Sequence, residues 1–267
     1  PFGGANQLVN VIDSSLEGHS DLNLTPCFGL MYRPTPRLSL GVMYHHEKTM
    51  SYEDGDGTLT NVAPDALREA VDASLDAAAG EAGRRDFALA TELGLPHMLS
   101  LGVAYRFHER LLVEFDAVHF GWSNFDQLDL AFSPDPAGAL SSTIPFHYED
   151  KWQYRVGMDF DLTEKVKLLA GYTRDQTPQP KESMGPILPD ASRNDWSLGA
   201  QYALGPWRLT ASWMAVLNEE RSNIRDGEPA IFEEERDDPE AVQLNTMEAG
   251  SFESVANIFA FGGGYQF

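Results

Sequence analysis

Nine segments of the chain alternate apolar residues with polar or small ones at a period of two. In the clearest segment Trp207, Leu209 and Trp213 alternate with Arg208 and Ser212. Because successive side chains of a β-strand point to opposite faces, each segment predicts a strand with one apolar and one polar face. The segments are residues 24–32, 38–46, 99–107, 111–117, 154–162, 166–172, 196–204, 207–217 and 255–267.

The connections between these segments alternate between short and long. Tight turns occupy residues 33–36, 107–110, 162–165 and 204–207, and long loops occupy residues 54–91, 124–148, 175–193 and 218–254. Short turns on one side and long loops on the other are typical of outer-membrane barrels. The pattern therefore predicts an all-β fold, an antiparallel up-and-down transmembrane β-barrel that forms a single domain over residues 1–267. The tight turns would face the periplasm and the long loops the outside.

Nine strands are too few and odd in number for such a sheet to close on itself. An upstream part must then be missing, or the sheet edges are paired by something else. The chain opens with Pro1-Phe2-Gly3-Gly4, with neither a start methionine nor a signal peptide. We therefore expect a fragment or a processed product.

The faces of the expected strands distinguish a membrane barrel from a soluble β-meander. The chain contains no run of 18 apolar residues, and a barrel strand never builds one. Aromatic residues gather where the barrel would meet the inner membrane interface: Tyr32, Tyr105, Phe107, Phe160, Tyr202, Tyr265 and Phe267. The opposite face carries charges that suit a wet lumen rather than the apolar interior of a soluble barrel.

The formal net charge of −22 argues against a nucleic-acid partner, because phosphate binding needs the opposite sign. Between Glu219 and Glu248 there are eleven acidic and three basic residues, so residues 218–254 are expected to form a solvated acidic extracellular loop. A second interpretation is a loop that binds divalent cations bridging surface lipopolysaccharide. Cys27 is the only cysteine, which excludes an internal disulfide and a cysteine metal cluster.

Residues 64–80 of the first long loop predict a short helix. Asp65 is a candidate N-cap after Pro64, and Leu67, Val71 and Leu75 recur at a spacing of four. These three side chains could offer an apolar patch to an arriving lipid, or simply pack the helix onto the barrel mouth. The preceding run Asp54-Gly55-Asp56-Gly57 lacks the later ligands of a calcium loop, so we expect a plain turn there.

No catalytic cluster, metal site or cofactor site is predicted. The sequence contains no HExxH and no GxSxG motif. Glu114 and Asp116 share one strand face, about 7 Å apart, which could suggest hydrolysis. With Arg106 and Arg155 on neighbouring strands, an ion-pair network in the lumen is the preferred interpretation.

Several stretches resemble the FadL/TodX family of outer-membrane transporters, over about residues 10–267. The most specific is Gly171-Tyr172-Thr173-Arg174-Asp175-Gln176-Thr177-Pro178, followed by Leu188-Pro189-Asp190, Arg193 and Trp196-Ser197-Leu198-Gly199. Residues 93–98, 115–125 and 146–157 are also similar to the middle of such proteins. The resemblance implies a barrel of 14 strands plugged by an N-terminal hatch, of which this chain would supply the last nine strands. The hatch and the early strands lie outside this sequence, so their binding residues cannot be carried over.

The resemblance implies a channel in the bacterial outer membrane for passive uptake of long-chain fatty acids or of aromatic or aliphatic hydrocarbons. The candidate lumen residues are Met43, Arg106, Glu114, Asp116, Arg155, Asp159 and Lys167. Arg106 or Arg155 could pair a fatty-acid carboxylate. Expected partners are the outer-membrane lipid and lipopolysaccharide, and the barrel-assembly machinery through Phe267. A general porin or a surface adhesin without a lipid site, and a soluble lipid-binding barrel, are the alternatives.

Overall fold

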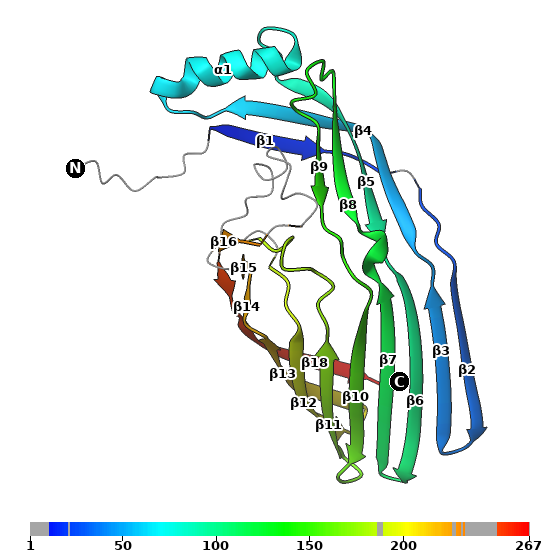
Figure 1. Ribbon diagram of the computed structural model, residues 1–267. Coiled ribbons are helices and arrows are strands. Elements are labelled where there is room, and N and C mark those ends of the chain that lie inside the picture. Colours follow the sequence, from blue (N-terminus) through cyan, green and yellow to red (C-terminus); the bar gives the residue numbers. More distant parts are fainter. Residues whose placement is uncertain are drawn as a thin grey trace. The chain divides into compact units, whose positions relative to one another are not determined.

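The chain folds into two compact units in the computed structural model (Figure 1). The structure describes residues 11–20, 22–185, 189–225, 228–230, 232 and 250–266. The small unit comprises Pro1–Leu24, Thr49–Gly94 and Gln127–Pro145, and the barrel unit comprises Thr25–Lys48, Leu95–Asp126 and Phe146–Phe267. Most of the acidic segment between residues 226 and 249, together with Leu188 and Phe267, lies outside the described residues.

The barrel unit is a sheet of nine antiparallel strands in the order β18-β13-β12-β11-β10-β7-β6-β3-β2. Strands that follow one another along the chain are neighbours in this curved sheet, which confirms the predicted up-and-down arrangement (Figure 1). The strands are β2 Cys27–Thr35, β3 Leu38–His45, β6 His97–His108, β7 Leu111–Gly121, β10 Lys151–Asp161, β11 Val166–Asp175, β12 Arg193–Leu204, β13 Trp207–Asn218 and β18 Val255–Tyr265.

The tight turns are stabilised by side chains of their own residues. The hydroxyl of Thr35 accepts a hydrogen bond from the Leu38 amide at 3.1 Å, and that of Thr163 accepts one from the Val166 amide at 3.0 Å. Gly205 has a φ of 58°, a left-handed conformation that glycine adopts without a steric penalty. These local features hold the strand pairs in register.

The register of the sheet separates an apolar face from a polar face. Across β7, β10, β11 and β12, one row on the apolar face contains Phe115, Val156, Tyr172 and Trp196. The adjacent row on the polar face contains Glu114, Gly157, Gly171 and Ser197. Large side chains of the apolar face stay uncovered, with Phe261 83% exposed. Such a face requires an apolar solvent rather than a second protein layer.

The small unit contains a second antiparallel sheet, in the order β1-β4-β5-β8-β9, together with helix α1. Its elements are β1 Ile12–Glu17, β4 Lys48–Asn61, α1 Asp65–Ala79, β5 Asp86–Leu95, β8 Gln127–Ser133 and β9 Ser142–Pro145. The segments 54–91 and 124–148, expected as long loops, therefore carry regular structure. Leu59, Leu75, Ala79 and Phe87 form a buried core between α1 and the sheet.

Two local expectations for the small unit were wrong. Pro64, not Asp65, is the N-cap of α1, and Asp65 is its first helical residue, where a carboxylate favours the positive end of the helix dipole. The run from Asp54 to Gly57 is not a turn but part of β4. A Cβ at Gly55 would lie 2.8 Å from the Leu89 carbonyl oxygen, so glycine is required there by close strand packing.

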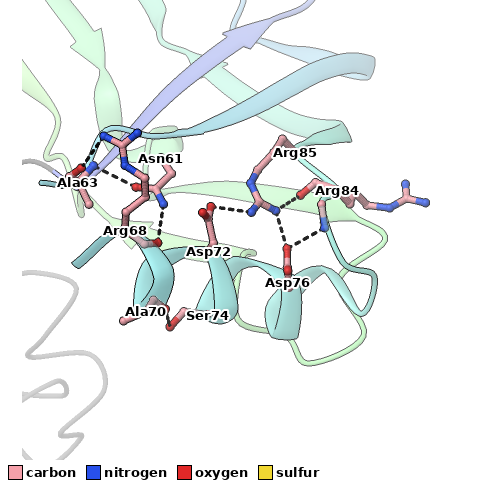
Figure 2. Close-up of polar contacts among 10 residues, drawn as sticks. Asn61, Ala63, Arg68, Ala70, Asp72, Ser74, Asp76, Arg84 and Arg85 are labelled. Atoms are coloured by element: carbon pink, nitrogen blue, oxygen red, sulfur yellow. Dashed lines mark hydrogen bonds and ion pairs between the residues drawn. The ribbon is translucent and has the colours of Figure 1, made fainter. Parts of the chain in front are cut away.

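Arg85 connects α1 to the start of β5 (Figure 2). Its guanidinium lies 2.9 Å from Asp72 and 2.8 Å from Asp76, which are one helical turn apart (Figure 2). Hydrogen bonds from Asn61 and Arg85 lower the pKa of Asp72, and those from Arg85 and the Gly83 amide lower the pKa of Asp76. Both carboxylates are therefore stabilised in their charged form.

Short elements complete the described structure. They are the 3₁₀ turn η1 Trp122–Asn124 and the two-residue strands β14 Arg221–Ser222, β15 Ile224–Arg225, β16 Glu228–Pro229 and β17 Ser251–Phe252. Pairing of β14 with β17 and of β15 with β16 orders part of the segment after β13. Within the described residues, no helix is both long and apolar enough to cross a bilayer.

Candidate ligand-binding wall and mouth pocket

All seven candidate lumen residues lie on the polar face of the nine-stranded sheet. The register places Met43 opposite Ser100, Glu114 opposite Gly157, and Asp116 opposite Arg155. Arg106, Asp159 and Lys167 lie on the same face, closer to the tight turns. The residues therefore spread along the height of the wall rather than meeting in one site.

The carboxylates on this wall have different surroundings. Asp159 accepts a hydrogen bond from Lys167 at 2.7 Å, and Asp161 lies 3.6 Å from the same ammonium group. Asp116 faces Gly102, where a Cβ would lie 2.5 Å from its Oδ1 atom. Glycine opposite this carboxylate therefore leaves room for it on an otherwise flat surface.

The expected ion-pair network of Glu114 and Asp116 with the two arginines does not form among the described residues. Arg106 lies beside the tight turn, opposite Leu112, and donates to the Glu109 carbonyl oxygen at 3.3 Å. Arg155 is opposite Asp116 in register but donates from Nε to Gln153 at 2.5 Å. Strand neighbours alone could not show which partner each long side chain takes.

A shallow pocket of about 430 Å³ lies on the polar face across β7, β10, β11, β12 and β13. Glu114 and Asp159 line it together with the apolar side chains of Leu112 and Leu169. The wall therefore combines apolar contact area with carboxylates at this level. Such a mixed surface can pass an apolar molecule along without holding it tightly.

A second pocket of about 410 Å³, here called the mouth pocket, lies where the strands of the barrel unit meet their long loops. Its aromatic side chains are Phe120, Trp122 and Tyr148, and the rings of Trp122 and Tyr148 meet edge to face at 5.9 Å. The remaining lining residues are Lys151, Gln153, Asp175, Gln176, Thr177, Pro178, Pro189, Asp190, Ala191 and Arg193. Aromatic side chains and polar groups thus line one cavity, as in small-molecule binding sites.

Both cations of the mouth pocket are already paired. Arg193 lies 2.8 Å from Asp175 and 3.5 Å from Asp195, and Lys151 donates to Glu149. Burial, together with the nearby Asp190 carboxylate, raises the pKa of Tyr148, so its hydroxyl keeps its proton. Among its described lining residues, the pocket therefore carries neither a free cation nor a titrating phenol.

The loop wall of the mouth pocket is held by Arg221. Its guanidinium donates to the Asp190 carbonyl oxygen at 2.8 Å, to the Thr177 hydroxyl at 3.3 Å and to the Gln179 carbonyl oxygen. Thr177 in turn donates to the Asp190 carboxylate at 2.6 Å. These bonds join the two ends of the loop between β11 and β12, so the pocket is pre-formed.

Sequence reasoning missed the polar residues of the mouth pocket. Lys151, Asp175 and Arg193 lie where β10, β11 and β12 each extend three residues beyond the predicted strand. The alternation continues only in β10, where Trp152 and Tyr154 alternate with Lys151 and Gln153, whereas residues 173–175 and 193–195 are all polar and resemble loop. A signal was present in the stretches that resemble the transporter family, because residues 175–178, Pro189, Asp190 and Arg193 belong to them and line the pocket.

The three helix residues proposed as a capture patch belong mainly to the core of the small unit. Leu75 is 4% exposed and Val71 packs against the same core cluster, whereas Leu67 is 47% exposed. Their common face points at the sheet because a spacing of four places them on one side of a helix. Only Leu67 offers free apolar surface.

The fold and the wall together define a transmembrane β-barrel of the outer-membrane type. The chain belongs to the family described as outer membrane protein transport protein (OMPP1/FadL/TodX), whose model matches residues 20–267. This family consists of transport channels rather than enzymes, and it locates the protein in the bacterial outer membrane. No curated protein matches the sequence.

Solved structures show the same fold at low sequence identity. A FadL homologue of Pseudomonas aeruginosa is 21% identical, with a TM-score of 0.64, over 88% of this chain and 50% of its own. The toluene transporter TodX of P. putida is 17% identical, with a TM-score of 0.56, over 94% of this chain and 52% of its own. The toluene transporter TbuX of Ralstonia pickettii is 14% identical, with a TM-score of 0.51, over 91% and 48%. The chain spans about half the length of these structures.

Proposed function

We propose that this chain forms part of a passive channel through which hydrophobic small molecules, hydrocarbons or long-chain fatty acids, cross the bacterial outer membrane. The observation that carries the proposal is the mouth pocket, where Phe120, Trp122 and Tyr148 meet at the loop end of the polar wall. Aromatic side chains supply a large apolar contact area at little conformational cost. A pocket at this end can collect apolar molecules before they pass along the wall.

The charges of the mouth pocket favour neutral hydrocarbons over fatty-acid carboxylates. A carboxylate would have to displace Asp175 or Asp195 from Arg193, or Glu149 from Lys151. A neutral ring needs no such exchange and requires only contact with the aromatic side chains. The two toluene transporters with the same fold fit this preference, although their low identity supports the fold alone.

The test compares toluene and oleate binding to the purified, refolded protein by calorimetry. Replacing Trp122 with Ala should weaken toluene binding about threefold to tenfold, since an aromatic contact contributes roughly 0.5–1.5 kcal/mol beyond its area. Trp207→Ala is the matched control, because Trp207 lies at the tight-turn end, where it packs on Tyr265. Equal affinity of Trp122→Ala and wild type would exclude the mouth pocket as the binding site.

A general porin or an adhesin would give a different result. A porin would conduct ions through planar bilayers without block by toluene or oleate, and an adhesin would bind neither compound. The proposed contacts with lipopolysaccharide and with the barrel-assembly machinery stay predictions. The latter contact was assigned to Phe267, which lies outside the described residues.

A further inference from the structure

A groove of about 420 Å³ crosses β10, β11, β12 and β13 on the apolar face of the barrel unit. Its floor is Ala170, which lies between Met158 and Leu198 in one row of the sheet. The next row toward the long loops holds the larger side chains of Tyr172 and Trp196. A small side chain among large ones thus leaves a hollow in a face that is otherwise covered by bulky groups.

Two polar groups of the groove walls are already hydrogen bonded. The Tyr172 hydroxyl donates to Asn194 Oδ1 at 2.7 Å, and the Trp213 indole N–H donates to Asn257 Oδ1 at 3.0 Å. The rings of Tyr172 and Trp196 pack at 4.6 Å. These contacts fix the aromatic rings that form the groove walls.

We propose that this groove binds one acyl chain of an outer-membrane lipid. It opens on the face that an outer-membrane barrel presents to the bilayer. No side chain that lines it is charged. Its lining offers few hydrogen-bonding groups to a polar head group or to water, whereas a methylene chain restores the contacts that a void would forfeit. The inference does not depend on which molecule the channel carries.

The site recognises the chain of the lipid rather than its head group. Arg174 is the next position on the same face, about 7 Å from Tyr172 along the strand. Its guanidinium is already paired with Glu219. An anionic head group therefore meets no free cation beside the groove, and lipids with zwitterionic and anionic heads should bind alike.

The preference for a bound chain over bulk lipid must come from packing alone, because leaving the bilayer core offers no hydrophobic gain. Each pair of atoms in contact contributes about 0.1–0.2 kcal/mol, so several such pairs correspond to roughly fivefold enrichment.

The test is quenching of tryptophan fluorescence by phosphatidylcholine with brominated acyl chains, in vesicles that contain the refolded full-length protein. Trp196 and Trp213 line the groove and report directly on a chain within it. We expect one component of the quenching to saturate. It should do so at a mole fraction of brominated lipid roughly one fifth of that which random lipid contact would require. Ala170→Leu should remove this component. Ala211→Leu should retain it, because Ala211 lies on the same face outside the groove.

Quenching that rises in proportion to the brominated fraction in all three proteins would overturn the proposal. Loss of the saturable component on adding toluene or oleate would also overturn it, because the groove would then be a substrate site. If Ala170→Leu does not fold, electron spin resonance of spin-labelled phosphatidylcholine on the wild type decides the question. The comparison protein is the double variant Ala211→Leu, Trp196→Ala. A larger immobilised lipid fraction in the wild type than in this double variant supports the groove, and an equal fraction excludes it.

Discussion

Apolar side chains of the small unit turn toward α1 and are buried, whereas those of the barrel unit lie on a face that no described segment of that unit covers. Phe87 in β5 is 4% exposed, and Phe261 in β18 is 83% exposed. Both side chains belong to strands with the same period of two. The period therefore identifies a two-faced strand but not the solvent in which its apolar face resides. A packed helix covers the apolar face in the small unit, and the bilayer covers it in the barrel unit.

The largest effect that sharpens this comparison is expected for Phe87→Ala. Removing a buried aromatic side chain should destabilise the small unit by about 3–5 kcal/mol, because it leaves a cavity beneath α1. Hydrogen exchange of residues 49–94, followed by mass spectrometry, measures this loss. Phe261→Ala in detergent is the matched control, and comparable losses in both variants would mean that the two faces are not differently solvated.

Val103→Arg tests the apolar face of the barrel unit. Val103 lies mid-strand in β6, opposite Leu40 and Phe115. A charge there should cost about 2–4 kcal/mol in lipid vesicles. The exposed Leu67→Arg on α1 should change stability by only about 0.5 kcal/mol. Urea unfolding in vesicles, with both variants measured side by side, distinguishes these values, and an unaffected Val103→Arg would contradict a membrane-facing position.

Arg221→Ala tests whether the barrel unit also contains a region packed as in a water-soluble protein. Met184, in the loop between β11 and β12, and Asn223, in the segment after β13, are buried, and Arg221 holds the two ends of that loop together. Losing a charged donor to buried carbonyl groups should destabilise this loop locally by about 1.5–3 kcal/mol. Faster hydrogen exchange over residues 176–192, with the strands unchanged, is the expected result. Arg208→Ala, in a strand away from the loop, should leave that exchange as in the wild type.

The smallest effect is expected for Arg85→Met, and it depends on pH. The pKa values of Asp72 and Asp76 lie below their ordinary value of 3.8 in the folded protein. Their contribution to stability is therefore present above that value and is lost as pH falls through the lower folded values. Protease sensitivity of the small unit in the wild type should rise on acidification from about pH 6 to about pH 2, a range that spans the ordinary aspartate pKa. The same pH dependence in Arg85→Met would show that the arginine does not stabilise these carboxylates.

The nine barrel strands could be predicted because each alternates large apolar side chains with polar or small ones over most of its length, as Leu101 and Val103 do with Gly102 and Ala104. The sequence also predicted α1 of the small unit but not its sheet, since β4 places Gly55 and Gly57 at buried positions. A strand whose inward residues are glycines has no apolar signal, and its acidic outward residues resemble a loop. Long-range packing against Leu89 and Phe132, which sequence reading does not reveal, gives these glycines their role.

The candidate site was predictable only in part. The period correctly assigned Glu114, Asp159 and Lys167 to one face, because strand geometry alone decides that. It could not show that Arg155 turns to Gln153, nor that Trp122 and Tyr148 meet in one pocket. Those contacts depend on rotamers and on loops that approach from distant parts of the chain.

Strand β7 shows how selection can act separately on neighbouring codons. Glu114 belongs to the wall along which a solute would travel, and the next residue, Phe115, belongs to the face that meets lipid. A change at Glu114 can alter which molecules are admitted while membrane insertion is left intact. A change at Phe115 can alter membrane insertion while the choice of molecules is left intact. Barrels that descend from one ancestor could thus change their solute selectivity while they keep their membrane insertion. This offers a simple physical route to a family of transporters with different solutes.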